Sequence, residues 1–299
     1  MSTTDKDVTV APGEGTTKRV GAPRPLNPKP KNRGSLVFGL LAWLIGLIFV
    51  APVLWMLLTS FHAETDAATR TPSFFAPLVL DGYRSFLAAG PLPPMINSFT
   101  ASLVSTVLVI LLAFPAAYAL SIRRVEKWTD VMFFFLSTKM LPIVAGILPL
   151  YLIALQFNLL DNIFTLVLLY TSMNMPIAVW MLQSFLAEVP IEMLEAAQID
   201  GAGLLRTLTS VVAPVVMPGI AAVGLISFIF SWNELLLARV LTSTVAGTAP
   251  VFLTGFVTSQ GLFLAKVCAA SVVISLPVLI AGFAAQDKLV QGLSMGAVK

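Results

Sequence analysis

The chain has 299 residues, of which 57% are hydrophobic and only 11% are charged, and its formal net charge is +3. Soluble domains carry about 25% charged residues, so this composition excludes an ordinary soluble domain and indicates an integral membrane protein. The single cysteine, Cys268, excludes an internal disulfide and a CxxC metal site, and one histidine, His62, cannot build a metal cluster.

Residues 1–33 form the first segment, which is rich in proline, lysine and arginine and holds few residues that could build a core. We expect a disordered basic tail there. The apolar run after it is too long for a cleaved signal peptide. The expected organisation is therefore this tail followed by one transmembrane domain, residues 34–299.

Six apolar runs follow, each of about 20 residues or more, which is the length that a bilayer core requires. Backbone groups in lipid must pair internally, so each run is expected to be a helix and the fold class is all-α and polytopic. The runs are 35–60, 97–121, 131–155, 163–185, 211–237 and 262–285. Seven prolines inside them are expected to kink rather than stop the helices: Pro52, Pro115, Pro142, Pro149, Pro176, Pro218 and Pro277.

The placement of lysine and arginine predicts the orientation, since cytoplasmic loops carry an excess of both. The first tail, the loops 122–130 and 186–210 and the C-terminal tail carry 13 of them, whereas the opposite loops carry 3. This ratio predicts cytoplasmic termini and a cytoplasmic loop 186–210. It puts 62–96 outside, where we expect an ordered cap with a short amphipathic helix near 81–87. The alternative for that segment is a plain connector.

The loop 186–212 predicts a compact helical knob. Pro190 suits the first turn of a helix, and Gly201 suits the left-handed position just after its end. We expect Ile191, Leu194 and Gln198 to share one face, and Met193, Ala196 and Ala197 another. A second helix is expected over 202–212, with kinks at Pro214 and Pro218.

The knob carries four acidic residues and one arginine. An acidic helix is a poor ligand for an anionic leaflet, so a protein groove is the preferred partner. An amphipathic turn that rests on lipid headgroups is the alternative.

Three stretches resemble permeases of ATP-binding-cassette (ABC) importers. The spacing of Glu195-Ala196-Ala197, Gly201 and Pro214 is similar to the EAA loop of that family, with Val211 and Ala213 departing from its usual residues. Phe230-Ser231-Trp232-Asn233-Glu234 resembles an element of the maltose-permease type, and the ending 292–299 resembles that of its second, six-span subunit. The run 137–142 looks most similar to permeases for polyols such as sorbitol and mannitol.

The resemblance implies a type I importer fold and a cell inner membrane location. It implies a heterodimer with a second permease subunit, two copies of a cytoplasmic ATPase and an extracytoplasmic solute-binding protein. ATP and Mg would bind the ATPase, and this chain would bind no cofactor, which agrees with its lack of a Walker A motif. The residues implied to couple to the ATPase are Glu195, Ala196, Ala197, Asp200, Gly201, Gly203 and Pro214.

The C-terminal tail is expected to reach between the two ATPase subunits through Gly292, Gly296 and Lys299, with a frayed end as the alternative. Ionisable residues at membrane depth are costly and indicate function by default. The expected substrate path therefore contains Lys139 and Glu234, together with hydrogen-bonding or aromatic groups at Asn174, Trp232 and Asn233. The alternative is that the two charged residues pair with neighbours and hold helices together.

Two other classes of function compete with the importer. A secondary transporter or channel subunit for small polar solutes would suit six kinked spans, but it predicts inverted repeats, which are not seen, and leaves the knob unexplained. An intramembrane enzyme would need paired aspartates, or serine with histidine, at membrane depth. The only histidine lies at a span end, and no signature of a catalytic site occurs. The chain is therefore expected to be non-catalytic.

Overall fold

The computed structural model describes residues 33–67, 74–123, 125–258 and 261–297. The predicted tail thus lies almost wholly outside the described residues. The chain divides into two compact units, 1–50 and 51–299. The helices are α1 (Arg33–Thr59), α2 (Glu64–Ala67), α3 (Asp81–Ala88), α4 (Leu92–Ser121), α5 (Trp128–Met140), α6 (Ile143–Gln156), α7 (Ile163–Leu186), α8 (Ile191–Ile199), α9 (Leu204–Arg206), the π-helix η1 (Thr207–Val212), α10 (Ala213–Val215), α11 (Met217–Trp232), α12 (Leu236–Leu241), α13 (Ala249–Thr254) and α14 (Leu264–Ala297). Strands β1 (Val257–Thr258) and β2 (Gly261–Leu262) pair in an antiparallel hairpin.

Four helices, α1, α4, α7 and α14, are long and apolar enough to cross a membrane. Two further pairs of helices are bent, by 89° between α5 and α6 and by 85° between 204–215 and α11. If each bent pair counts as one span, the total with the four long helices is six. Counted in this way, the predicted six spans match the structure. The predicted continuity of the third and fifth spans does not.

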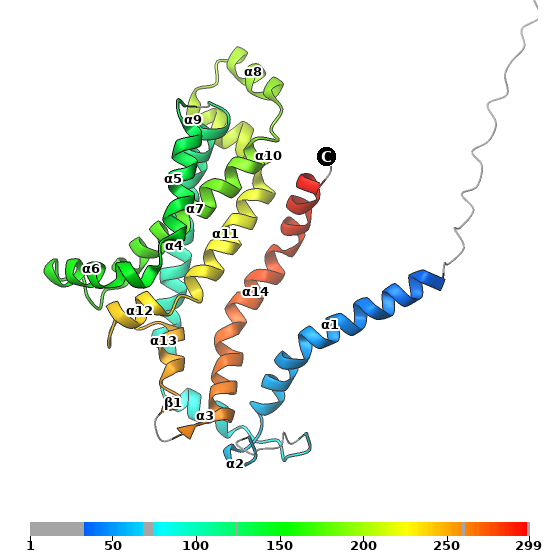
Figure 1. Cartoon of the computed structure of the whole chain (residues 1–299), viewed down its shortest axis with the longest axis vertical. Coiled ribbons are helices and arrows are strands. Elements are labelled where there is room, and N and C mark those ends of the chain that lie inside the picture. The colour runs from blue at the N-terminus through cyan, green and yellow to red at the C-terminus, as the bar shows by residue number, and fades with distance from the viewer. Residues whose placement is uncertain (1–32, 68–73, 124, 259–260, 298–299) are drawn as a thin grey trace, which may run out of the picture. The chain divides into compact units, whose positions relative to one another are not determined.

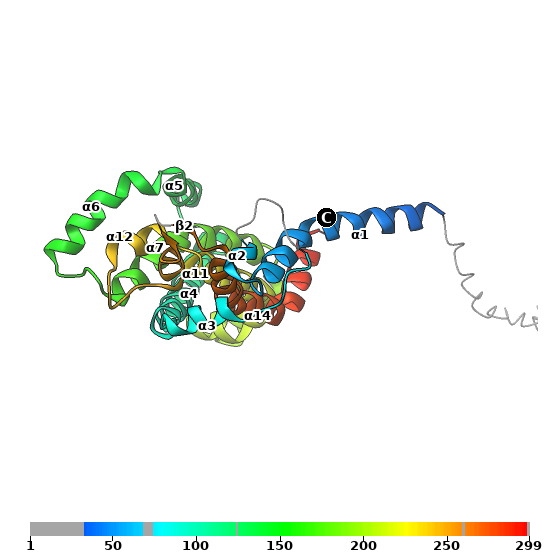
Figure 2. The same cartoon turned by 90° about the horizontal axis from the view of Figure 1, so that it is seen from below.

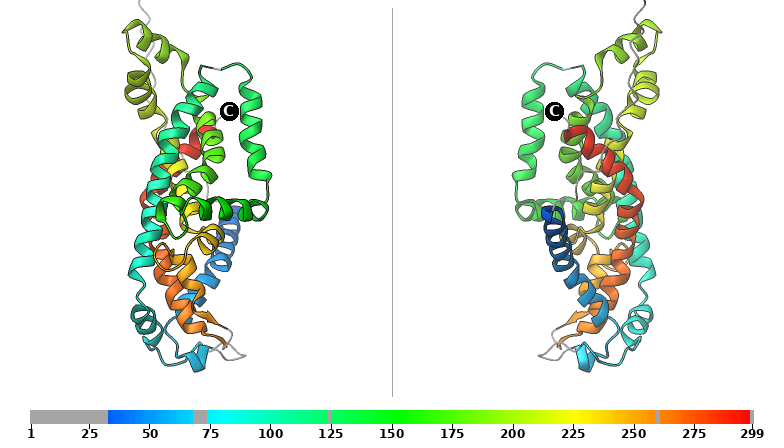
Figure 3. Two further views of the ribbon diagram at one scale, coloured as in Figure 1. Left: turned by 90° about the vertical axis from the view of Figure 1, so that its left-hand side faces the viewer. Right: turned by 90° about the vertical axis from the view of Figure 1, so that its right-hand side faces the viewer.

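The third span breaks at Leu141 and Pro142, whose ψ values of 127° and 121° are extended rather than helical. The residue before a proline avoids the helical region, and proline itself offers no N–H to the preceding turn. Pro142 is thus a stop, not the tolerated kink that the sequence predicted. Figure 3 shows the result: α6 runs across the direction of α5, and Figure 2 shows both lying beside the bundle.

The fifth span is also shorter than predicted. It begins at Met217, after Val216 leaves the helical region with φ −93° and ψ 11°, and Pro218 lies in the first turn of α11. It ends at Trp232, and a separate short helix, α12, follows. The other five prolines, Pro52, Pro115, Pro149, Pro176 and Pro277, lie inside helices as expected.

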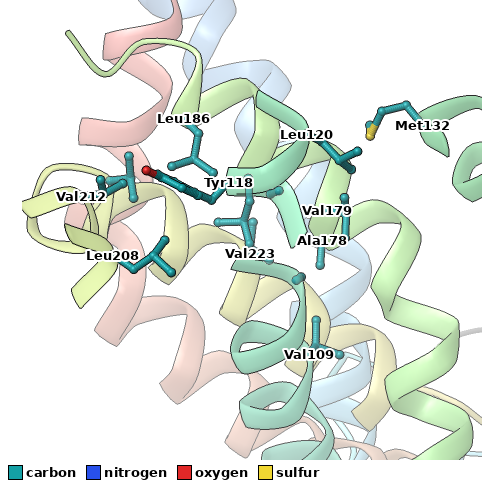
Figure 4. Close-up of a cluster of buried hydrophobic side chains, with 14 of the residues drawn as sticks. Val109, Tyr118, Leu120, Met132, Ala178, Val179, Leu186, Leu208, Val212 and Val223 are labelled. Atoms are coloured by element: carbon teal, nitrogen blue, oxygen red, sulfur yellow. The ribbon is translucent and has the colours of Figure 1, made fainter. Parts of the chain in front are cut away.

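The core of the second unit lies where α4, α7 and α11 run side by side, with α14 next to α11 (Figure 1). Alanines such as Ala113, Ala117 and Ala178 are fully or almost fully buried there. Small side chains let helix backbones approach closely, which favours helix packing in membranes. Figure 4 shows Tyr118 and Leu186 against Leu208 and Val212, so this core extends from the bundle to the segment that follows α8.

At the start of α14, the described parts of the segment 62–96 form the expected cap. Helix α3 covers the predicted stretch 81–87. Gly82 lies so close to α14 that a Cβ there would be 3.0 Å from the Ala265 carbonyl oxygen. The Glu64 carboxylate accepts hydrogen bonds from the backbone N–H groups of Ala265 and Lys266, at 3.3 and 3.4 Å, and so caps the first turn of α14.

Gly219 lies where α11 packs against α7. A Cβ at this position would lie 2.5 Å from ring carbons of Phe185. We expect Gly219→Ala to destabilise the protein by about 1 kcal/mol through overpacking, measured by unfolding in mixed micelles. Gly282→Ala in α14 is the matched control, because nothing lies within 4 Å of its built Cβ. Equal stability of the two variants would contradict this packing argument.

Candidate functional site

Helix α8 ends in the motif that the sequence predicted. The N–H of Gly201 donates to the Gln198 carbonyl at 3.0 Å, and the N–H of Ala202 donates to the Ala197 carbonyl at 2.9 Å. This is a Schellman motif, which needs a left-handed residue after the helix. Gly201 has φ +71°. Pro190, expected in the first turn, instead stands at the N-cap, one residue earlier.

The burial of α8 differs from the expected faces. Leu194 and Ala197, three residues apart, are the two buried side chains. Met193, Glu195, Ala196 and Asp200 are exposed. Leu194 joins the core cluster that includes Tyr118 and Leu186. Ala197 is therefore covered by other parts of this chain, whereas Glu195 and Ala196 are exposed and can contact a partner.

The chain after Gly201 returns to the bundle through one helical stretch, α9, η1 and α10, instead of the simple helix expected over 202–212. Gly203 starts it and accepts hydrogen bonds from both the N–H and the hydroxyl of Thr207. Thr207, Leu208 and Val212 of η1 are buried. Pro214 follows in α10. The knob is thus connected covalently to α7 and α11 and packed against α4 and α7.

The five expected path residues do not meet in one place. Glu234 lies after the end of α11, and its two carboxylate oxygens accept hydrogen bonds from Leu236, Leu237 and Ala238 N–H at 3.0–3.2 Å. These are the free donors at the start of α12, where a negative charge is favoured. Glu234 thus caps the start of α12 with its carboxylate.

We expect Glu234→Ala to lower the stability of the folded protein by about 1 kcal/mol, the usual cost of a lost N-cap. Glu234→Gln keeps one acceptor oxygen and should lose less. Micelle unfolding and solute uptake should fall together in the two variants. Abolished uptake by a Glu234→Gln protein of wild-type stability would instead place this side chain in the path.

Trp232 and Asn174 are buried and already have partners. The Trp232 Nε1–H donates to the Ile274 carbonyl of α14 at 3.2 Å, and its ring stacks on Phe228. The Asn174 amide donates to the Tyr170 carbonyl and to the Ser231 hydroxyl, at 2.8 and 3.0 Å. The Ser105 hydroxyl completes a buried network that links α4, α7 and α11. Trp232 is therefore not a free stacking surface for a sugar.

Lys139 and Asn233 line separate pockets. Lys139 lies with Thr138 and Ser172 in a pocket of about 690 Å³ between the α5–α6 bend and α7. It forms no ion pair with any described residue. Asn233 lies in a pocket of about 370 Å³ bounded by α11, α13 and α14.

Asp161, which sequence reasoning missed, joins two distant loops. Its carboxylate accepts hydrogen bonds from the backbone N–H groups of Ser243, Thr244, Val245 and Ala246 at 2.8–3.2 Å. Burial alone would raise the pKa of Asp161, but these four N–H groups outweigh it and lower the pKa to about 2. The partners are more than 80 residues away in sequence, so no local pattern could have indicated the contact.

Two neighbouring side chains of α4 also bind the loop 243–249. The Asn97 amide donates to the Val245 and Gly247 carbonyls, and the Ser98 hydroxyl accepts from Ala249 N–H. The segment 243–249 is therefore held by Asp161 at its first four residues and by α4 at its later ones. In the C-terminal tail, Gly292 and Gly296 lie within α14, whereas Lys299 lies outside the described residues.

Comparisons with known proteins agree on one family. Residues 109–294 match the model for the inner membrane component of binding-protein-dependent transport systems. A probable ABC transporter permease, y4oR of Sinorhizobium fredii, is 35% identical over 88% of this chain and 95% of its own length. The sulfoquinovosyl glycerol permease SmoH of Agrobacterium fabrum is 33% identical over 71% of this chain and 74% of its own. The trehalose permease SugB of Mycobacterium tuberculosis is 31% identical over 70% and 77%.

A solved structure shows the same fold. A chain of a bacterial ABC transporter involved in the import of the acidic polysaccharide alginate superposes with a TM-score of 0.69. The likeness covers 86% of this chain and 98% of that one, at 22% sequence identity. At this identity the likeness shows the fold alone.

Proposed function

The chain belongs to the family of binding-protein-dependent transport system inner membrane components, and from this premise we propose that it imports a carbohydrate or sugar alcohol and is driven through α8. It is a non-catalytic membrane permease subunit of an ABC importer, with the type I importer fold. ATP hydrolysis therefore belongs to another subunit. What we propose is the class of solute and the way in which the ATP-hydrolysing subunit moves this chain.

The surface of the knob carries the proposal. Ile199 is 87% exposed and Leu205 is 75% exposed, on a segment that lies beyond the ends of the membrane helices. Large apolar side chains in such a place indicate a protein partner. Exposed Glu195 and Asp200 stand beside them. We infer that this surface inserts into a groove on a cytoplasmic ATPase.

The packing of α8 supports the transmission of movement. Leu194 of α8 and Leu208 and Val212 of η1 share one buried cluster with residues of α4, α7 and α11. Close-packed cores move as units instead of deforming continuously. A displacement of α8 by the ATPase would therefore move these three helices together and alternate the access of the path.

Sugars and sugar alcohols are the proposed solutes. Relatives whose names state a solute include permeases for sulfoquinovosyl glycerol, diacetylchitobiose and trehalose. The run 137–142 supports the polyol branch by resemblance only. Lys139 and Asn233, whose side chains line pockets, are the two path residues that we retain.

The proposed assembly contains a second permease subunit, two ATPase subunits that bind ATP and Mg, and an extracytoplasmic solute-binding protein. The proposed location is the inner membrane, with both termini in the cytoplasm, as the distribution of lysine and arginine favours. Gly292 and Gly296 would bring the C-terminal end close to the ATPase pair.

Reconstitution tests this function. The complete complex in proteoliposomes should take up labelled trehalose or sorbitol only when ATP and the binding protein are both supplied. Omission of the ATPase subunit should abolish uptake. Uptake that persists without ATP and follows an ion gradient would overturn the importer mechanism in favour of a secondary transporter.

A further inference from the structure

The pocket beside Asn233 is lined by apolar side chains and by a few uncharged polar ones. It has a volume of about 370 Å³ and lies between the end of α11, α13 and the first half of α14. Its polar lining residues are Asn233, Thr254, Ser271 and Ser275. The others are apolar, and no Asp, Glu, Lys or Arg is among them. The volume lies within the usual range for small-molecule sites.

The hydrogen bonds that these polar groups already make determine which donors and acceptors remain free for a ligand. The Thr254 and Ser275 hydroxyls donate to the carbonyls of Val251 and Val272, at 2.7 and 2.9 Å, so their oxygens remain free to accept. One N–H of the Asn233 amide donates to the Ile229 carbonyl at 2.9 Å, which leaves its other N–H and its carbonyl oxygen. The Ser271 hydroxyl has no partner among the described residues.

The pocket thus presents mainly acceptors, with two donors and no charge. A sugar hydroxyl both donates and accepts, and matches this set. A carboxylate or phosphate accepts only, and would need cationic partners to leave water. The apolar lining residues Leu253 and Val278 can contact the C–H face of a ring.

One hydrogen bond joins the two helices that line the pocket. The bond from Trp232 Nε1–H to the Ile274 carbonyl joins α11 to α14 directly beside it. Ser271 lies seven residues, about 10 Å of helix, from the start of α14. In the proposed orientation this depth is the extracytoplasmic half of the membrane, where a solute arrives first.

We infer that this pocket is a subsite of this chain for an uncharged, hydroxyl-rich solute, and that Ser271 and Asn233 are its specificity-determining residues. The inference rests on the proposed import of a sugar or sugar alcohol. It assigns this contact to α14 and to the end of α11, whereas Lys139 lines a separate pocket.

Protection of an introduced thiol tests the subsite. Cys268 is the only native cysteine, so Ser271→Cys in a Cys268→Ser background gives one reactive position in the pocket. With the complete complex in proteoliposomes, trehalose or sorbitol at about ten times its Kd should slow labelling by a methanethiosulfonate reagent about tenfold. Glucuronate at the same concentration should give no protection. The matched control, Ser210→Cys on the knob, should show no protection by any of them.

The second measurement is solute uptake by a variant whose larger side chain fills the pocket. Ser271→Phe should lower uptake about tenfold, while stimulation of the ATPase by sugar-loaded binding protein stays at the wild-type level. Ser271→Ala keeps the pocket open and should lose less. Normal uptake by Ser271→Phe, or an unprotected thiol at position 271 in a complex that transports the sugar, would overturn the subsite alone. No uptake of any neutral sugar by the wild-type complex would instead overturn the proposed function.

Discussion

Replacement of Asp161 by alanine should lower the free energy of unfolding by about 1 kcal/mol, because four loop N–H groups lose a charged acceptor. This value is small for a charged acceptor because most of these hydrogen bonds are exposed and water screens the charge of the carboxylate. The expected consequence is a loosened 243–249 segment, which Asn97 and Ser98 would then hold from α4 alone. Unfolding of the purified protein in mixed micelles measures the loss.

The pH dependence separates this role from general packing. The pKa of Asp161 is lowered to about 2 from an ordinary 3.8. A lowered pKa stabilises the folded protein above the unfolded value and loses that stabilisation as the pH falls toward 2. The difference in stability between the wild type and Asp161→Asn should therefore be largest above about pH 5 and should shrink between pH 4 and 2. A difference that is constant down to pH 2 would contradict the hydrogen-bonded carboxylate.

Gly201→Val should uncouple transport from ATP hydrolysis. A β-branched residue at φ +71° is strained by on the order of 1–2 kcal/mol, and relief of that strain would open the Schellman motif and reorient α8. We expect uptake to fall about tenfold or more while the ATPase keeps its basal turnover. The measurement is uptake and hydrolysis in the same proteoliposomes.

Gly201→Asn is the matched control, because asparagine tolerates the left-handed region best after glycine. It should keep most of the coupled uptake. Equal loss of uptake in the two variants would show that the glycine is needed for close approach by a partner and not for its backbone conformation.

The parts of the fold that local chemistry decides could be predicted from the sequence. Gly201 is an example, since a helix that ends before glycine has few other ways to satisfy its last carbonyls. The apolar runs also gave the number of spans, because bilayer thickness sets their length. The same reasoning could not separate a kinking proline from a stopping one. Pro149 continues its helix and Pro142 ends one, and the surrounding packing decides which.

The candidate path was the least predictable part. Glu234 looks like an unpaired charge at membrane depth only if the fifth span continues to residue 237. The structure ends that span at Trp232 and starts α12 at Leu236, whose free N–H groups satisfy the carboxylate. Hydropathy does not show a break of three residues. Ser271 was missed for a related reason, because an isolated serine in an apolar run carries no signal until the pocket is known.

Site-directed cross-linking between α8 and the ATPase tests the central claim most directly. In a Cys268→Ser background, Glu195→Cys and Ala196→Cys place thiols on the exposed side of α8, whereas Leu194→Cys and Ala197→Cys place them on the buried side. With thiols along the ATPase groove, we predict cross-links from the exposed pair, with yields that change on addition of ATP, and none from the buried pair. Equal yields from both pairs, or no cross-link from positions 195 and 196 in a complex that transports, would contradict the docking of this helix.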